Sequence, residues 1–271
     1  MTVNVRNWQW RCWGSAVALL LLAAAVWAAE GRARPAKIGD YNPDDPTVEM
    51  FAAMEKGDIA VKLIPKDSTQ CRVLIENKTK QPLNVKLPEA FAGVPALAQL
   101  GAGGGGRTNR SSSSSNNNQN QSMGGGMGGM GGGGMGGGGG MFNVPPEKVG
   151  QLKVTTVCLE HGKREPREQI PYEIKPLESF TTKAGVRELC ALLGGGQINQ
   201  RAAQAAAWHL NNGMSWRELA AKRIRHASGT SEPYFSSEEI QSGMKIAAIA
   251  AQLSEERQKQ NTGTSESISP K

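Results

Sequence analysis

The chain has 271 residues, 34 of them glycine, with 38% hydrophobic residues and a formal net charge of +7. About 170 residues remain when four segments are set aside, and they are enough for one compact unit. These segments are the expected leader (1–29), the glycine-rich tract (101–141) and two stretches poor in apolar residues (30–47 and 258–271). This length excludes a multidomain machine and a polytopic membrane protein. The positive and negative charges are mixed along the chain, with no long block of one sign, so nucleic-acid binding is not indicated.

Residues 1–29 have the order of a secretory signal peptide. Two arginines precede the apolar run 16–29, and small residues suit cleavage after Ala25 or Ala28. The run is shorter than the roughly 20 residues of a membrane-spanning helix. We therefore expect a secreted, periplasmic or cell-surface protein with no stable transmembrane anchor after cleavage; an uncleaved anchor is the alternative. Residues 30–47, rich in proline, glycine and charge, are expected to form a linker.

The next part of the chain has the pattern of antiparallel β-structure. Short β-branched runs of near-alternating polarity, separated by turn clusters, predict strands at 58–65, 70–76, 82–87, 151–159 and 170–176. We expect these strands to form a small β-sandwich from residues 48–100 and 142–182.

A low-complexity tract, residues 101–141, interrupts the predicted sandwich. Glycine, serine, asparagine and glutamine offer too little apolar surface to offset the entropy of ordering the chain, so we expect a disordered loop. Five methionines punctuate this loop: Met123, Met127, Met130, Met135 and Met141. Thioether ligation of Cu(I) or self-association are the functional interpretations. No histidine or cysteine joins the set, so a plain flexible loop is favoured and no cofactor is expected.

The last third of the chain is predicted to be helical, over residues 183–257, which makes the fold class α+β. Apolar periodicity and end signals place helices at 184–193, about 198–211, about 216–227 and about 237–257. Ser215 with Glu218, and Ser236 with Glu239, are capping-box pairs. Residues 258–271 are expected to be a disordered tail.

Two short segments stand out by their chemistry. The first, Val157-Cys158-Leu159-Glu160-His161, ends a predicted strand, and the second, Ala203-Gln204-Ala205-Ala206-Ala207-Trp208-His209, lies within a predicted helix. A strand cysteine, and a helical glutamine four residues before a tryptophan, resemble the thioester domains of Gram-positive surface adhesins. The resemblance covers only these two motifs. It implies an internal thioester between Cys158 and Gln204 that captures a nucleophile on a target surface.

The chemistry of such a bond suggests roles for neighbouring residues. The i, i+4 spacing places Trp208 on the same helical face as Gln204, where the indole would shield the acyl group from water. Either His161 or His209 would shuttle the proton. The rest of the pattern departs from the family: Val157 replaces an aromatic residue, and the two reacting residues are only 46 positions apart.

Other interpretations of these residues stay open. Cys158 is typical of a buried small hydrophobe, or of a disulfide drawn from Cys71, Cys158 and Cys190. No second ligand pair supports a zinc site, so no metal is predicted. The basic cluster that begins at Lys222 is expected to be a solvated helix face.

The sequence therefore predicts an exported protein without enzymatic activity, a binding or structural component whose envelope or surface partner is unknown. The alternative is a surface protein that forms the Cys158–Gln204 thioester and attaches covalently to a target nucleophile.

Overall fold

The computed structural model describes residues 41–96, 119–129 and 140–266, apart from the side chains of residues 142 and 262–266. The expected signal peptide, residues 1–29, lies outside this range. So do residues 30–40 of the expected linker, residues 97–118 and 130–139 of the insert, which include Met130 and Met135, and residues 267–271.

Six antiparallel strands form a closed barrel, which replaces the expected sandwich. In spatial order they are β2 (Ile59–Pro65), β3 (Gln70–Asn77), β8 (Val149–Cys158), β6 (Met123–Gly125), β5 (Phe91–Pro95) and β9 (Tyr172–Pro176). Strands β2, β3, β8 and β9 match predicted runs. The unpredicted strands β5 and β6 connect β8 to β9, so the sheet closes on itself. The α+β class is confirmed.

Strand β6 comes from the glycine-rich insert. Its residues pair with both β5 and β8, and Met123 and Met127 are fully buried. The expectation of disorder is therefore wrong for residues 119–129. The methionines supply the apolar surface, and the glycines let other parts of the backbone come close. A Cβ on Gly194, for example, would collide with the backbone of Gly126.

A smaller three-stranded sheet lies beside the barrel. It contains β1 (Thr47–Glu49), β4 (Leu83–Lys86) and β7 (Met141–Val144), with helix α2 (Met50–Lys56) directly after β1. The buried amide of Asn84 donates to the carbonyl oxygens of Asn42 and Asp45, at 2.5 and 2.8 Å. The end of the expected linker is therefore held against this sheet. Likewise the predicted strand 82–87 belongs here and not to the barrel.

Four helices follow the predicted order, the last two with clearly different bounds, and a short helix, α3, precedes them and was not predicted. They are α3 (Leu177–Phe180), α4 (Val186–Gly194), α5 (Gln200–Asn212), α6 (Trp216–Ala221) and α7 (Ser237–Glu266). The capping box of Ser215 and Glu218 is present. Helix α6 ends six residues early, and the hairpin of β10 (Arg223–Arg225) and β11 (Ser231–Pro233) takes its place.

Helix α7 is longer than predicted, because it continues through residues 258–266 of the expected disordered tail. This stretch begins with Gln258, Lys259 and Gln260, and glutamine and lysine have high helix propensity. None of the described helices has the length and apolar character that crossing a membrane requires.

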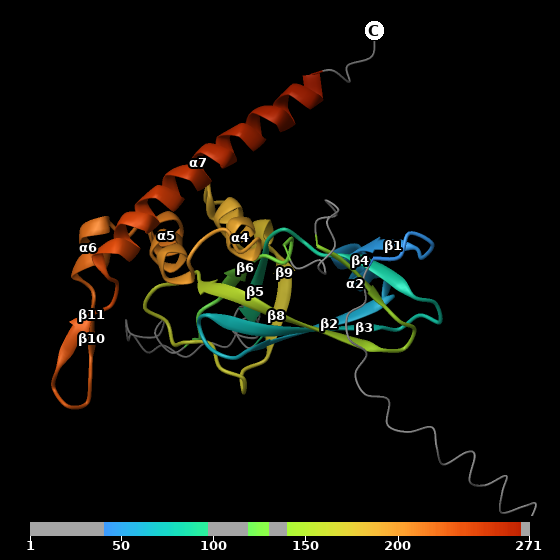
Figure 1. Cartoon of the computed structure of the whole chain (residues 1–271), viewed down its shortest axis with the longest axis horizontal. Helices are drawn as coiled ribbons and strands as arrows, with labels where there is room; N and C mark the ends of the chain where they lie inside the picture. The colour runs from blue at the N-terminus through green and yellow to red at the C-terminus, as the bar shows by residue number, and fades with distance from the viewer. Residues whose placement is uncertain (1–40, 97–118, 130–139, 267–271) are drawn as a thin grey trace, which may run out of the picture. The chain divides into compact units, whose positions relative to one another are not determined.

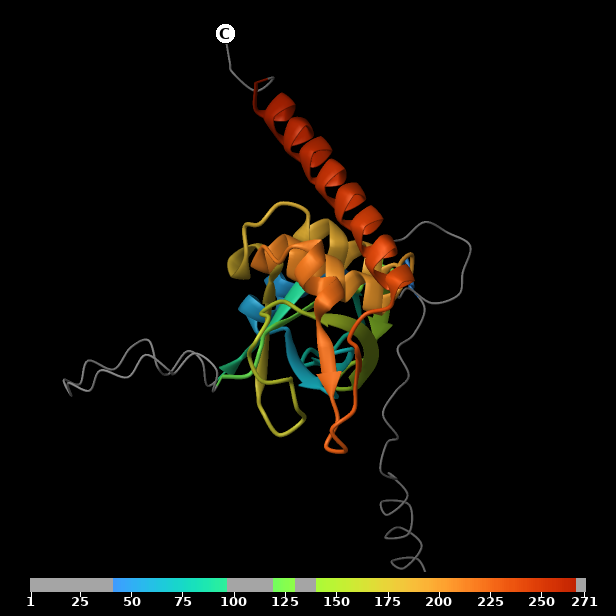
Figure 2. The same cartoon turned by 90° about the vertical axis from the view of Figure 1, so that its left-hand side faces the viewer.

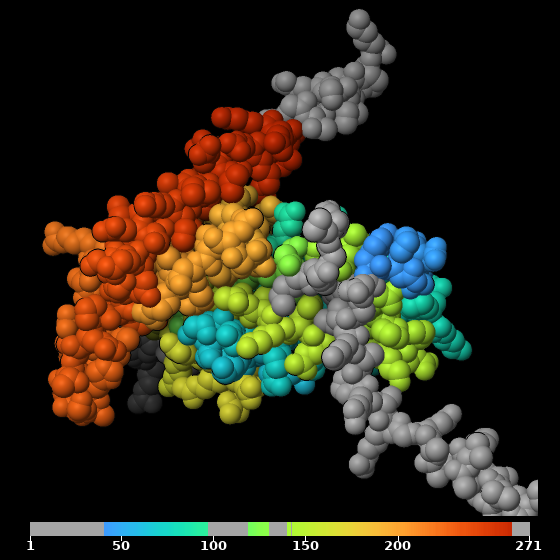
Figure 3. Space-filling view, viewed as in Figure 1, coloured from blue at the N-terminus to red at the C-terminus, as the bar shows by residue number. Residues whose placement is uncertain are grey.

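Helices α4, α5 and α7 are layered on one side of the barrel. Helices α4 and α5 contact β8, and α7 crosses both of them (Figures 1 and 2). Figure 3 shows α7, in red, lying on the orange helices. Small residues allow the close crossing: a Cβ on Gly243 of α7 would lie 3.0 Å from the carbonyl oxygen of Ala202 on α5. One hydrophobic core fills the barrel and includes Leu63, Val73 and Phe91. Another lies between the helices and the barrel and includes Val157, Leu159 and Leu189.

Candidate functional site

The structure brings Cys158 and Gln204 together at the seam between barrel and helices. Oε1 of Gln204 accepts a hydrogen bond from the backbone N–H of Cys158 at 2.8 Å, and Nε2 donates to the Cys158 carbonyl oxygen at 2.9 Å. Both residues are buried. The last residue of β8 that pairs with β3 is Thr155. Cys158 lies three residues further along β8, where β3 no longer pairs with it. There the Gln204 amide supplies the hydrogen bonds that a neighbouring strand would otherwise make with the N–H and C=O of Cys158.

The Cys158 thiol sits in an environment that keeps it protonated. Burial raises its pKa, and the nearby charges of Glu165, Asp67 and Glu160 raise it further. A protonated thiol is a weak nucleophile. The sequence predicted that the strand cysteine and the helical glutamine lie close together. The hydrogen bonds of the Gln204 amide go to the backbone of Cys158.

The three cysteines of the described residues, Cys71, Cys158 and Cys190, are free, so the disulfide that the sequence left open among them is not formed. Cys71 is the register partner of Val154, four residues before Cys158 on β8. Four residues of a strand span about 13 Å, too far for a disulfide. Cys190 lies on α4 in a different core cluster. Burial raises the pKa of Cys71 and of Cys190 to about 12.

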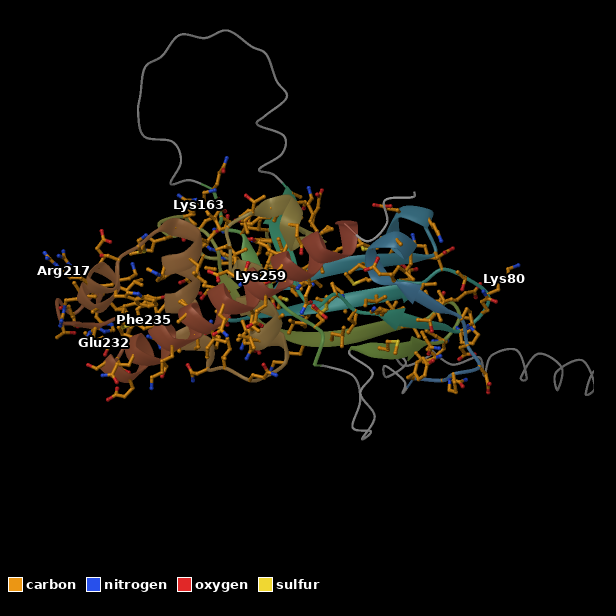
Figure 4. The ribbon with its side chains drawn as sticks, turned by 90° about the horizontal axis from the view of Figure 1, so that it is seen from above. Lys80, Lys163, Arg217, Glu232, Phe235 and Lys259 are labelled. Carbon is orange, nitrogen blue, oxygen red and sulfur yellow. The ribbon has the colours of Figure 1, made fainter. Side chains whose placement is uncertain are left out.

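Trp208, the second predicted partner of Gln204, is the centre of an aromatic cluster. Its ring centroid lies 4.8 Å from that of His161, 5.5 Å from that of Tyr234 and 5.8 Å from that of Phe235. The indole is 4% exposed, and its Nε1 has no hydrogen-bond partner among the described residues. Figure 4 places Phe235 among the helices, at the opposite end of this view from Lys80 in the β3–β4 turn.

A lysine lies over this aromatic cluster. Nζ of Lys222 is 5.3 Å from the Trp208 ring centroid and 5.2 Å from that of Tyr234. It also lies 2.9 Å from Nε2 of His161 and donates to it, which places the imidazole proton on Nδ1. We call His161, Trp208, Lys222 and Tyr234 the Lys222 cluster.

Burial makes the charged forms of the Lys222 cluster less favourable than they would be in water. Burial lowers the pKa of His161, the Lys222 charge lowers it further, and Glu218 opposes both. Burial also lowers the pKa of Lys222. Burial raises the pKa of Tyr234. In the described structure no carboxylate forms an ion pair with Lys222, so rings and an imidazole are its only partners.

Arg201 differs from Lys222 because its charge has a carboxylate partner. Its guanidinium lies 5.4 Å from the Tyr234 ring centroid, but it is paired with Glu239 at 2.6 Å and bonded to the Tyr234 carbonyl. Its charge is therefore neutralised, whereas that of Lys222 is not.

His209 has its contacts at the end of α5. Its ring stacks on Trp216 with the centroids 4.3 Å apart, and Nδ1 lies 2.8 Å from the carbonyl oxygen of Met214. His161 contacts Trp208, the predicted shield. The role of either histidine as a proton shuttle for Cys158 stays a prediction.

Sequence reasoning missed Lys222 and Tyr234 as site residues. Lys222 was assigned to a helix face, but α6 ends before it, and the N–H of Tyr234 bonds to the Lys222 carbonyl. The adjacent aromatics Tyr234 and Phe235, in a chain with 5% aromatic residues, were the available signal.

Within the described ranges, no group of three or more histidine, cysteine, aspartate or glutamate residues is arranged to hold a metal ion. The chain matches no protein-family model, no curated protein and no solved structure.

Proposed function

We propose that the protein is an exported, non-enzymatic binding component that holds an anionic group of its partner at the Lys222 cluster. The observation that carries this is the half-buried ammonium of Lys222, which lies against two aromatic rings and an imidazole and has no carboxylate partner among the described residues. A partly desolvated cation without a counter-ion favours an incoming carboxylate or phosphate oxygen. The leader at residues 1–29 supports the exported location.

The imidazole of the cluster also supports an acceptor-bearing ligand. The imidazole of His161 carries its proton on Nδ1 when Nε2 accepts from Lys222. A site that offers donors in excess is complementary to oxygen acceptors.

The test is binding of two anionic probes to the mature chain, a fluorescent oligoglutamate and inorganic tripolyphosphate. We expect at least one probe to bind, and Lys222→Gln to weaken that binding about tenfold, since hydrogen bonds to charged groups contribute about 1.5–3 kcal/mol. The two probes separate a carboxylate from a phosphate source.

Lys245→Gln is the matched control. Lys245 is an exposed lysine of α7, so this variant removes the same net charge without touching the cluster. Equal losses of affinity in the two variants would show that only the general positive charge attracts the probe. Unchanged affinity in Lys222→Gln would show that Lys222 does not hold it. Either result would refute the proposal.

The internal thioester stays a second proposal, supported by the contact between Gln204 and Cys158. Against it stand the raised pKa of the thiol and the engagement of both amide atoms with the backbone. Intact-mass measurement separates the two proposals. A thioester requires the mature chain to lack the mass of one ammonia, and Cys158→Ala must restore it. A full mass, with Cys158 alkylated once the chain is unfolded in urea, refutes it.

A further inference from the structure

The hairpin of β10 and β11 pairs with no other strand of the described structure. Its two strands form a sheet of their own, and every residue from Arg225 to Pro233 is exposed. The hairpin extends away from α6 into the surroundings (Figures 1 and 3). A lone two-stranded sheet has two outer edges, and a further strand can add wherever an edge offers unpaired N–H and C=O groups.

The register of the hairpin decides which backbone groups face outward. The N–H of His226 donates to the carbonyl oxygen of Thr230, so these residues form a hydrogen-bonded pair. Hydrogen-bonded and non-bonded pairs alternate along an antiparallel ladder. The next pair, Arg225 with Ser231, is therefore non-bonded, and so is the pair of Arg223, two positions further along β10. The N–H and C=O groups of Arg223 and Arg225 accordingly point away from β11.

The two outer edges of the hairpin differ in what they offer. On β11, Pro233 has no N–H, and the carbonyl oxygen of Ser231 already accepts a hydrogen bond from Nη2 of Arg223 at 2.8 Å. On β10, the N–H and C=O groups of Arg223 and Arg225 have no hydrogen-bond partner among the described residues. The open edge is therefore that of β10.

Positive charge flanks this open edge. The side chains of Arg223 and Arg225 share one face of β10, because they are two positions apart, and neither forms an ion pair with a described carboxylate. Glu232 is the only carboxylate between positions 222 and 234; it belongs to the other face and lies 3.4 Å from His226. Like charges disfavour the pairing of this edge with its own copy, whereas an acidic strand gains opposite-charge pairs across the ladder.

We propose that the β10 edge binds an extended, acidic segment of a partner protein, which adds to the hairpin as a third strand. Its backbone exchanges hydrogen bonds with Arg223 and Arg225, and its alternate acidic side chains lie beside the two guanidiniums. Lys222 directly precedes β10. The proposal therefore rests on the proposed function, since it names the kind of segment that carries the anionic group to the Lys222 cluster.

The test is the binding of three fluorescent peptides to the mature chain. In the first, glutamate and valine alternate. The second is the same peptide with N-methyl groups on consecutive central amides, which removes donors from both of its edges and keeps its charge. The third has lysine in place of glutamate. We expect the methylated peptide to bind about fivefold more weakly than the first, the equivalent of one net hydrogen bond, and the lysine peptide to bind most weakly.

Three results would overturn the proposal. Equal binding of the methylated peptide would show that charge alone attracts the acidic one. A lysine peptide that binds as tightly as the acidic peptide would show that the arginines do not select the partner. Absence of binding by the acidic peptide would show that the edge takes no strand of this kind.

A pair of variants assigns the pairing to β10. Arg225→Pro and Arg225→Gln both remove the charge, but only proline also removes the outward N–H. That N–H makes no bond within the hairpin, so proline is compatible with the edge. We expect Arg225→Pro to bind the acidic peptide about fivefold more weakly than Arg225→Gln. Equal affinities of the two variants would overturn the proposal.

Should proline disorder the hairpin, hydrogen exchange of the wild type decides instead. Saturating acidic peptide should slow amide exchange within residues 222–226, and unchanged exchange there would overturn the proposal.

Lys222→Gln separates this proposal from the proposed function. In this variant the methylated peptide should still bind more weakly than the acidic peptide, because strand pairing does not need the ammonium. Unchanged affinity for the acidic peptide in Lys222→Gln would refute the Lys222 cluster as the anion site. Loss of the difference between the two peptides would refute strand addition.

Discussion

The side-chain amide of Gln204 pairs with the backbone of Cys158 through two hydrogen bonds, across 46 positions of the chain. It joins helix α5 to the end of barrel strand β8. The contact thus connects the helical layer to the sheet through one buried side chain.

Replacement of Gln204 by alanine should destabilise the protein by about 2–5 kcal/mol, because it leaves a buried N–H and a buried C=O of Cys158 without partners. Urea unfolding followed by circular dichroism measures the loss. Gln252→Ala, at an exposed position of α7, is the control and should change the free energy of unfolding by less than about 0.5 kcal/mol. Similar values for the two variants would contradict a structural role for the amide.

Replacement of Gly194 by alanine should destabilise the protein by about 1–3 kcal/mol, because the new Cβ collides with the backbone of Gly126 and that backbone must shift. Gly195→Ala is the matched control, since its Cβ would meet nothing closer than 3.5 Å. Thermal unfolding of both variants measures the difference. If both unfold at the wild-type temperature, then the strand drawn from the glycine-rich insert does not pack against α4.

Stability should depend on pH through His161. The folded protein lowers the pKa of this imidazole below 6.5, through burial and the Lys222 charge and against the opposing effect of Glu218. Just below pH 6.5 the unfolded chain therefore binds the proton more readily than the folded chain. The free energy of unfolding should fall as the pH falls through 6.5 towards the folded pKa.

Unfolding titrations between pH 5 and pH 8 check this. His161→Gln should flatten the slope, whereas His226→Gln, which replaces a histidine outside the Lys222 cluster, should leave it. A slope retained in His161→Gln would assign it to another group.

The three thiols should resist alkylation in the folded protein. Cys71, Cys158 and Cys190 are buried, and burial raises the pKa of each, so little thiolate is present at pH 8. Iodoacetamide followed by mass spectrometry should show no adduct under native conditions and three adducts on the mature chain in urea. Rapid native labelling at one site would show that its thiol is accessible.

Local sequence patterns determined the elements whose signals lie within a few residues. Alternating polarity identified the barrel strands β2, β3 and β8, and the capping box of Ser215 and Glu218 marked the start of α6. These signals work because strand pleating and helix ends depend on immediate neighbours. The sequence also selected Cys158 and Gln204 together, as a thioester candidate, whereas the contact in the structure is between the Gln204 amide and the Cys158 backbone.

Only the tertiary structure decided the barrel closure and the Lys222 cluster. Strand β6 has almost no side-chain signal, because its glycines matter for the backbone atoms of β5, β8 and α4 that they allow to approach. Lys222 and His161 are ordinary charged or polar residues in the sequence. What distinguishes them is burial and the partners that distant segments supply or withhold, and those long-range terms are absent from any short window of the chain.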